Sequence, residues 1–349
     1  MAEWTAQRGG VAVMKAAVAS LRIMSDRGSP AGQREAIDFV TRRVRDASKN
    51  GAKEAMEAGA SGVLVRMMHA ADFGSERAVA CSAALYSIAA LGDDAVRDGL
   101  QEAGAVTETL RHLRAGSTDC VWTLTALTAG RGAHRHSALV EAGAVSELAS
   151  VLRKGEPGAG MVQQAARAMG NLAAGSDEGR AAVVHAGAVF DLVRMTELED
   201  EESGPTAFTM EALESLGKVS EGPSEDGALA AYSAGALPAL LKLLEPSARG
   251  VVEVEGPDAR SAAARVLCIM GRVASIREAM KFMYRTLERL VEARSMMINS
   301  DKDIVDQIDY FLSTCGLPGV PTPPGKAAAR RQIPRPSSDE GMCPSKIRI

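Results

Sequence analysis

The sequence predicts an all-α protein built as an array of repeated helical units. The first observation is the phrase Ala-Gly-Ala, whose glycine recurs at positions 59, 104, 143, 187 and 235. These glycines are 45, 39, 44 and 48 residues apart, close to the period of about 40–47 residues that solenoid units of two or three helices show. The second observation is that each phrase is followed by apolar residues at helical spacing. Such units stack so that neighbours bury one continuous core.

The unit is clearest between residues 141 and 189. Two helices are predicted there from apolar residues that share one helix face, namely Val145, Leu148, Val151 and Leu152, and then Val162, Ala165, Ala166, Met169 and Leu172. Gly175 and Ser176 indicate a helix stop followed by an N-cap, so a short helix is predicted over 177–184. Gly187 then lets the chain turn sharply into the next helix.

Residues 1–57 are predicted to form an irregular N-terminal capping repeat. A cluster of helix breakers, Gly28, Pro30 and Gly32, separates its two predicted helices. The apolar positions that indicate these helices are Val11, Met14, Val18 and Leu21 in the first, and Ala36, Phe39, Val40 and Val44 in the second.

The main array of repeats is predicted over residues 58–316, with units at 58–102 and 103–141 before the central one. The units 185–233 and 234–273 carry long inter-helix loops at 197–208 and 245–261. Residues 251–255 read VVEVE, and we interpret them as loop because one isolated strand would have no partner. The polar unit 275–316 is predicted to be a C-terminal capping repeat, with Ser300 as an N-cap and Gly316 as a C-cap glycine.

Residues 317–349 are predicted to be a disordered, proline-rich basic tail. The tail holds seven of the fourteen prolines, and its six Lys and Arg against two acidic residues give a net charge of 6 − 2 = +4. The rest of the chain therefore carries about −4 − 4 = −8. A segment this poor in apolar residues cannot bury enough surface to order itself.

Composition limits the function. Hydrophobic residues make up 46% of the chain and aromatic residues only 3%, so the core must consist of many small contacts. A net charge of −4 gives no basic surface for nucleic acid. The five cysteines show no C-x-x-C, the first residues lack a signal sequence, and no apolar run is long enough to span a membrane. We expect a cytoplasmic protein, with the nucleus as a second location.

The phrase EAGAV-x-x-L followed by AAxAMGNLAAGSDEGRAAVV closely resembles an armadillo repeat, and the resemblance covers roughly residues 9–316. It implies three helices in each unit and a right-handed superhelical solenoid of about six to seven armadillo repeats. It also implies that the third helices line a concave groove, where a partner would bind.

No motif for catalysis is evident. His134 and His136 are two residues apart, which on a helix places them on different faces, so we interpret them as part of a solvated loop rather than a metal site. His69, His112 and His185 are isolated, and we interpret them as surface or packing residues. The glycines 155, 158 and 160 follow a predicted helix and lack a completed phosphate-binding pattern. We therefore expect no enzymatic activity, no catalytic residue, no metal and no cofactor.

The groove is where the resemblance places function. Armadillo proteins that bind extended peptides, such as importin alpha, carry a Trp on the third helix and an Asn four residues later. The Asn amide bonds a peptide backbone, and the Trp walls pockets for Lys or Arg stems. At the matching positions this chain pairs Arg167 with Asn171, Trp122 with Ala126, Ala83 with Ser87, Glu211 with Ser215, and Ala264 with Cys268. The ladder that importin-type binding requires is therefore missing.

The candidate groove residues are Arg43, Ser87, Trp122, Arg167, Asn171, Glu211 and Ser215. For Asn171 a peptide contact and a plain helix-surface role both stay open. Trp122 is expected in the core rather than on a binding platform. Arg42, Arg43 and Arg167 on one side, against Glu211 and the acids of 197–202 on the other, suggest a groove whose charge changes along its length.

We expect a non-enzymatic protein–protein interaction scaffold or adaptor whose partner is an extended peptide or a helix. One alternative is a nucleocytoplasmic transport adaptor that binds basic peptides. The other is the substrate-binding subunit of a separate ubiquitin ligase, because armadillo repeats accompany ligase modules in many plant-type ligases. The sequence leaves the oligomeric state open.

Overall fold

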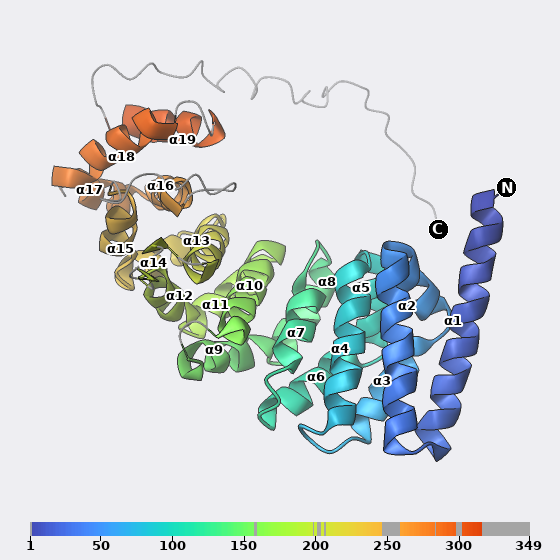
Figure 1. The fold of residues 1–349 in the computed structure, drawn as a ribbon. Coiled ribbons are helices and arrows are strands. Elements are labelled where there is room, and N and C mark those ends of the chain that lie inside the picture. Colours follow the sequence, from blue (N-terminus) through green and yellow to red (C-terminus); the bar gives the residue numbers. More distant parts are fainter. Residues whose placement is uncertain are drawn as a thin grey trace, which may run out of the picture.

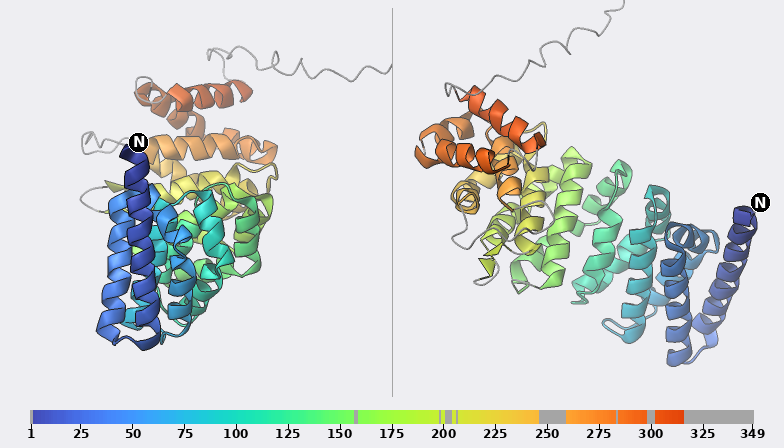
Figure 2. Two further views of the ribbon diagram at one scale, coloured as in Figure 1. Left: turned by 90° about the vertical axis from the view of Figure 1, so that its right-hand side faces the viewer. Right: turned by 45° about the horizontal axis from the view of Figure 1, so that its top comes forward.

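The computed structural model describes residues 2–315, except 157–158, 198, 201–203, 206, 246–258, 283 and 298–301. This described part contains nineteen helices, arranged one after another as an elongated, curved array (Figure 1). The prediction of an all-α solenoid is confirmed. Two views from other sides show that the helices change direction progressively from the N-terminal to the C-terminal end (Figure 2).

The helices group into six three-helix units, which follow α1 and the first half of α2. The helices of the N-terminal half are α1 (Ala2–Arg27), α2 (Pro30–Glu57), α3 (Ala60–His69), α4 (Glu76–Leu91), α5 (Asp94–Glu102), α6 (Ala105–Arg114), α7 (Cys120–Thr128), α8 (Ala133–Glu141), α9 (Ala144–Lys154) and α10 (Gly160–Gly175). Those of the C-terminal half are α11 (Asp177–His185), α12 (Ala188–Thr196), α13 (Ala207–Ser220), α14 (Asp226–Ser233), α15 (Ala236–Leu243), α16 (Ala259–Met270), α17 (Ala274–Phe282), α18 (Tyr284–Met297) and α19 (Lys302–Thr314).

Helix α2 serves two units because it continues through a kink at Ser48, whose φ of 51° is the only positive value at a non-glycine residue in the described part of the chain. Its first half is a third helix, and its second half is the first helix of the next unit. Ser48 lies eleven residues before Gly59, as Ser176 lies eleven before Gly187. At Ser176, by contrast, the backbone is extended and one helix ends before the next begins. The Ser176 hydroxyl accepts a hydrogen bond from the Gly179 amide at 2.9 Å, as the predicted N-cap requires.

The glycine of each Ala-Gly-Ala phrase makes the turn between the first and second helices of a unit. All five of these glycines are left-handed, with φ between 70° and 87°. A side chain in that conformation costs about 1–2 kcal/mol, because its Cβ crowds the following carbonyl oxygen. The phrase recurs because five of the six units make the same left-handed turn.

The third helices form one continuous row. Helix α2 packs on α4, α4 on α7, α7 on α10, α10 on α13, α13 on α16 and α16 on α19, and Figure 1 shows the first four side by side. Small polar side chains tie neighbours together at close range. The Thr125 hydroxyl donates to the Gln164 carbonyl at 2.9 Å, and the Ser215 hydroxyl donates to the Ala166 carbonyl at 2.8 Å. At these two points the third helices approach closely.

The loop expected at 197–208 contains a short antiparallel pair, β1 (Glu199–Asp200) with β2 (Gly204–Pro205). The expectation of a plain loop there is corrected to this extent. Residues 251–255, Ser300, Gly316 and the tail 317–349 lie outside the described residues. Among the helices that the structure describes, none is both long and apolar enough to cross a membrane.

Phe39, one of the positions that indicated the second helix, lies on α2 but is 46% exposed, because the buried face of α2 runs through Ile37, Val40 and Val44. The interpretation of His136 was wrong. His136 does not lie in a solvated loop: it sits on α8, is fully buried, and its Nε2 lies 2.8 Å from the Thr128 carbonyl oxygen. Helix α8 begins at residue 133, so His136 lies on this helix rather than in the loop before it.

The buried His136 makes stability depend on pH. Burial lowers the pKa of His136, and the nearby Arg135 lowers it further against the opposing effects of Thr128, Asp94 and Asp98. An unfolded histidine titrates near pH 6.5, so between that value and the lower folded pKa the unfolded chain binds the extra proton.

We therefore expect the free energy of unfolding to fall as the pH drops from about 6.5 towards the lower folded pKa of His136. The slope should disappear in His136→Gln, measured by urea denaturation at several pH values. His185→Gln, at an exposed histidine, should keep the slope. Equal slopes in the wild type and His136→Gln would contradict the assignment.

Candidate binding groove

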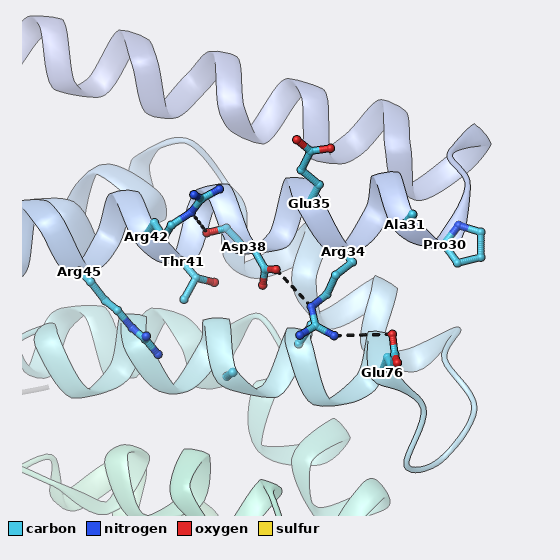
Figure 3. A pocket seen from close by; sticks show the side chains of 11 residues that line it. Pro30, Ala31, Arg34, Glu35, Asp38, Thr41, Arg42, Arg45 and Glu76 are labelled. Atoms are coloured by element: carbon cyan, nitrogen blue, oxygen red, sulfur yellow. Dashed lines mark hydrogen bonds and ion pairs between the residues drawn. The ribbon is translucent and has the colours of Figure 1, made fainter.

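An open groove of about 750 Å³ lies between α2 and α4, at the N-terminal end of the third-helix row. Figure 3 shows its lining side chains extending from both helices. Its lining residues are Pro30, Ala31, Arg34, Glu35, Asp38, Thr41, Arg42, Arg45, Glu76, Ala80 and Ala83.

One end of the groove is occupied by its own ion pairs. The Arg34 guanidinium lies 3.2 Å from the Asp38 carboxylate and 3.7 Å from that of Glu76 (Figure 3). Because the three side chains are about half exposed or more, these pairs add little stability. They do neutralise the charge of Arg34 locally.

The other end carries two arginines that no carboxylate balances. Arg42 donates from Nε to the Asp38 backbone carbonyl at 3.4 Å, and Arg45 donates from Nε to the Ser87 hydroxyl at 3.2 Å. Within the described ranges, neither guanidinium forms an ion pair. The Arg45 side chain reaches from α2 towards α4 (Figure 3), so this bond fixes its direction.

The floor of the groove consists of small side chains, and its one hydroxyl already has a hydrogen-bond partner. Ala80 and Ala83 present only methyl groups from α4. The Thr41 hydroxyl is buried and donates to the Ile37 carbonyl of its own helix at 2.8 Å. A bound chain could therefore approach this floor without displacing a large side chain.

Three of the residues predicted from the sequence lie near this groove, but each is engaged by other parts of the protein. Arg43 pairs with the buried Glu54 at 3.4 Å, within α2. Ser87 is buried, donates to the Ala83 carbonyl at 2.9 Å and accepts from Arg45. Trp122 is half-buried and packs against the core.

Arg167 and Glu211, predicted to give the groove opposite charges, form one ion pair. The Arg167 Nη2 and Nε atoms lie 2.6 and 2.9 Å from one Glu211 carboxylate oxygen, joining α10 to α13. The hydrogen bond to Glu211 raises the pKa of Arg167. Beside it, Lys218 pairs with Glu214 at 2.7 Å. The centre of the row is thus internally neutralised.

Asn171 and Ser215 also have partners inside the row. The Asn171 amide donates to the Thr128 hydroxyl at 3.3 Å, and its oxygen accepts from the Lys218 ammonium at 3.4 Å. Ser215 is fully buried against Ala166. The structure therefore brings Arg167, Asn171, Glu211 and Ser215 together at the α10–α13 contact.

The sequence reasoning did not single out Arg45. A signal existed: positions 38, 42 and 45 share one face of α2 at the spacing of one and two helical turns. That face becomes a groove only because α4 packs beside it, and the sequence does not state this pairing.

The described residues offer little for chemistry. No group of three or more His, Cys, Asp or Glu side chains among them could hold a metal ion. Burial raises the pKa of the Cys81 and Cys268 thiols to about 12 and that of Cys120 to about 11. These three thiols stay protonated at neutral pH and are poor nucleophiles.

Comparison with solved structures finds helical repeat proteins. An engineered protein from a structural genomics consortium superposes with a TM-score of 0.71 at 24% identity, over 86% of this chain and 68% of that one. A designed armadillo repeat protein in complex with the peptide (KR)4 matches with a TM-score of 0.61 at 23% identity, over 74% and 99% of the two chains. A computationally designed armadillo repeat protein for modular peptide recognition gives 0.60 at 23%, over 73% and 99%.

Comparison with protein-family models and with curated protein sequences gives no match. The chain is an α-solenoid of stacked three-helix units whose third helices form one packed row. Its fold is that of the armadillo repeat proteins, as the repeated Ala-Gly-Ala unit predicted.

Proposed function

We propose that this protein is a non-enzymatic interaction scaffold that binds an extended segment of a partner protein along its third-helix row. The observation that carries the proposal is the open groove of about 750 Å³ between α2 and α4, with charged side chains on its rim and methyl groups on its floor. Extended chains bind well to such surfaces, where a few anchored side chains give specificity.

The solved neighbours support a peptide as the kind of partner, because one of them was solved with a bound peptide. They do not favour the same peptide. A transport adaptor for basic segments would need free Asn and Trp side chains in successive units, whereas Asn171 bonds Thr128 and Lys218, and Trp122 packs against the core. We propose that the scaffold works in the cytoplasm.

A peptide-library selection on the full chain tests the proposal. Selected peptides should lose at least ten-fold in affinity for Ala83→Tyr, because the ring would fill the floor of the groove. Ala181→Tyr makes the same change at an exposed position of α11, a first helix, and should leave the affinity within two-fold. Fluorescence anisotropy with labelled peptides gives both numbers.

Two outcomes would contradict the proposal. One is a selection that yields no peptide with measurable affinity. The other is a set of peptides that bind both tyrosine variants as tightly as the wild type.

A further inference from the structure

We infer that the α2–α4 groove selects an acidic segment, in which side-chain carboxylates of the partner bind the guanidinium groups of Arg42 and Arg45. The inference rests on the proposed function and specifies the partner's chemistry. It starts from the distribution of charge along the third-helix row.

Among the described residues that line the groove, positive charge lacks an ion-pair partner at one place. Arg34, Arg167 and Lys218 each have a carboxylate partner, respectively Asp38 with Glu76, Glu211, and Glu214. Arg43 is paired with Glu54. In the part of the chain that the structure describes, Arg42 and Arg45 are the arginines of the groove without such a partner.

The two guanidinium groups leave α2 from neighbouring positions but point to different sides, that of Arg45 towards α4 and that of Arg42 away from it (Figure 3), so each would take its own carboxylate of the partner. Arg42 and Arg45 are three residues apart on α2, a spacing that puts their Cβ atoms about 5–6 Å apart on one face. Each guanidinium has five N–H donors, and towards the residues that the structure describes only Nε is used in each. The remaining donors match the planar, two-oxygen geometry of carboxylates.

Arg45 is also held in its working direction before a ligand arrives. Its Nε bonds the Ser87 hydroxyl, which is buried and donates in turn to the Ala83 carbonyl. Part of the entropy cost of ordering a long side chain is therefore already met in the free protein.

The acidic side chains of the groove lie apart from this pair. Glu35 is seven residues before Arg42, about two helical turns or 10 Å along α2, which is close to the Debye length at about 0.1 M salt. Asp38 is closer, but its carboxylate is engaged by Arg34. Asp46, which follows Arg45 and is four residues after Arg42, is exposed and forms no ion pair with either arginine among the described residues, so both guanidinium groups stay open to a partner's carboxylates.

The surroundings suggest the residue next to the acid. Phe39 is 46% exposed and lies three residues before Arg42, so the two are neighbours on the surface of α2. The methyl floor at Ala80 and Ala83 lets a peptide backbone come close. The preferred segment therefore combines Asp or Glu with an apolar side chain.

Full-chain protein and three labelled decapeptides test the inference by fluorescence anisotropy at about 50 mM salt, where exposed charges are least screened. The peptides alternate Glu, Gln or Lys with Leu-Ser spacers. We expect the Glu peptide to bind at least ten-fold more tightly than the Gln peptide. The double variant R42Q/R45Q should lose that preference.

The matched control is R22Q/R66Q, which removes the same charge from exposed arginines of α1 and α3. It should change the affinity for the Glu peptide by less than two-fold. Circular dichroism should show equal helicity in all variants. Because R42Q/R45Q removes exposed side chains only, its fold is expected to persist.

Equal binding of Glu and Gln peptides, or equal losses in the two double variants, would overturn the inference. So would an anionic oligonucleotide or a phosphopeptide that alone requires Arg42 and Arg45. If instead a neutral or Lys peptide binds and is displaced by Ala83→Tyr, the scaffold function stands and only the acidic preference fails.

Discussion

Replacing Arg135 with alanine should lower the free energy of unfolding by about 3 kcal/mol, since breaking a buried charged network typically costs this much. Arg135 is 1% exposed as a residue, and its side chain is fully buried at the junction of α5, α7 and α8. Its Nε donates to the Leu127 carbonyl at 2.8 Å and Nη2 to the Ala129 carbonyl at 2.7 Å. Alanine would leave these carbonyls without donors and open a cavity.

The same guanidinium holds two acids of the preceding unit. Nη2 lies 3.0 Å from the Asp94 carboxylate, and Nη1 bonds Asp98. Burial raises the pKa of Asp94, but the Arg131 amide and the Arg135 guanidinium outweigh burial and hold this pKa below its usual value. Since both carboxylates are about half exposed, they would regain water in the variant, so most of the loss comes from the carbonyls and the cavity.

Urea denaturation followed by circular dichroism measures the effect. Arg34→Ala is the matched control, because that arginine also pairs with two acids but its side chain is 47% exposed. It should cost less than about 1 kcal/mol. Hydrogen exchange should also quicken in α7 and α8 of Arg135→Ala alone. If both variants unfold at the same urea concentration, the buried contacts of Arg135 do not stabilise the junction of α5, α7 and α8 as predicted.

The local origin of this junction explains what the sequence could not predict. The position eight residues before the Ala-Gly-Ala glycine is Gly51 in one unit and Gly179 in another, and in each a Cβ would collide with a carbonyl of the preceding third helix. Arg135 holds the same position in its unit. There the guanidinium bonds carbonyls at the end of the preceding third helix, those of Leu127 and Ala129. From the sequence alone, an arginine at this position would be predicted to be exposed, whereas Arg135 is buried.

The fold was predictable for a different reason. The N-cap at Ser176 is a local feature of its unit, while the left-handed glycine and the apolar periodicity recur in five of the six units, so each copy reinforces the others. The kink at Ser48 was not predictable. Ser48 is equivalent to the N-cap Ser176, but α2 continues through it instead of a new helix beginning there.

The site was predictable only as a region. Matching positions on the third helices correctly pointed to the row, but Arg167 and Glu211, 44 residues apart, became partners through the register between α10 and α13. The same register decides that Arg45 meets Ser87 while Arg43 meets Glu54. Which arginine is free for a ligand depends on how neighbouring units pack. The sequence pattern of one unit does not predict this packing.

Replacing Gly175 with alanine should cost about 2 kcal/mol, because the new methyl group would overlap a buried ring. Gly175 ends α10, and a Cβ there would occupy the position of the His136 imidazole on α8. The ring cannot move aside cheaply, since it is fully buried and bonded to the Thr128 carbonyl.

A double-mutant cycle with His136→Ala isolates this contact. The single change His136→Ala removes the ring and should itself destabilise the fold, but in its presence the methyl group at position 175 has room. We therefore expect the double variant to be more stable than the sum of the single losses by about 1–2 kcal/mol. Urea denaturation of the four proteins gives the coupling.

Gly187→Ala supplies the control for the cycle. That glycine has a φ of 70°, and no atom lies within 4 Å of the place that a methyl group would take, so alanine there is strained by backbone conformation alone. Its loss should add to that of His136→Ala without coupling. Additivity at Gly175 as well would mean that α8 and α10 tolerate the extra methyl group by shifting apart, and that the close packing of first and third helices does not depend on this glycine.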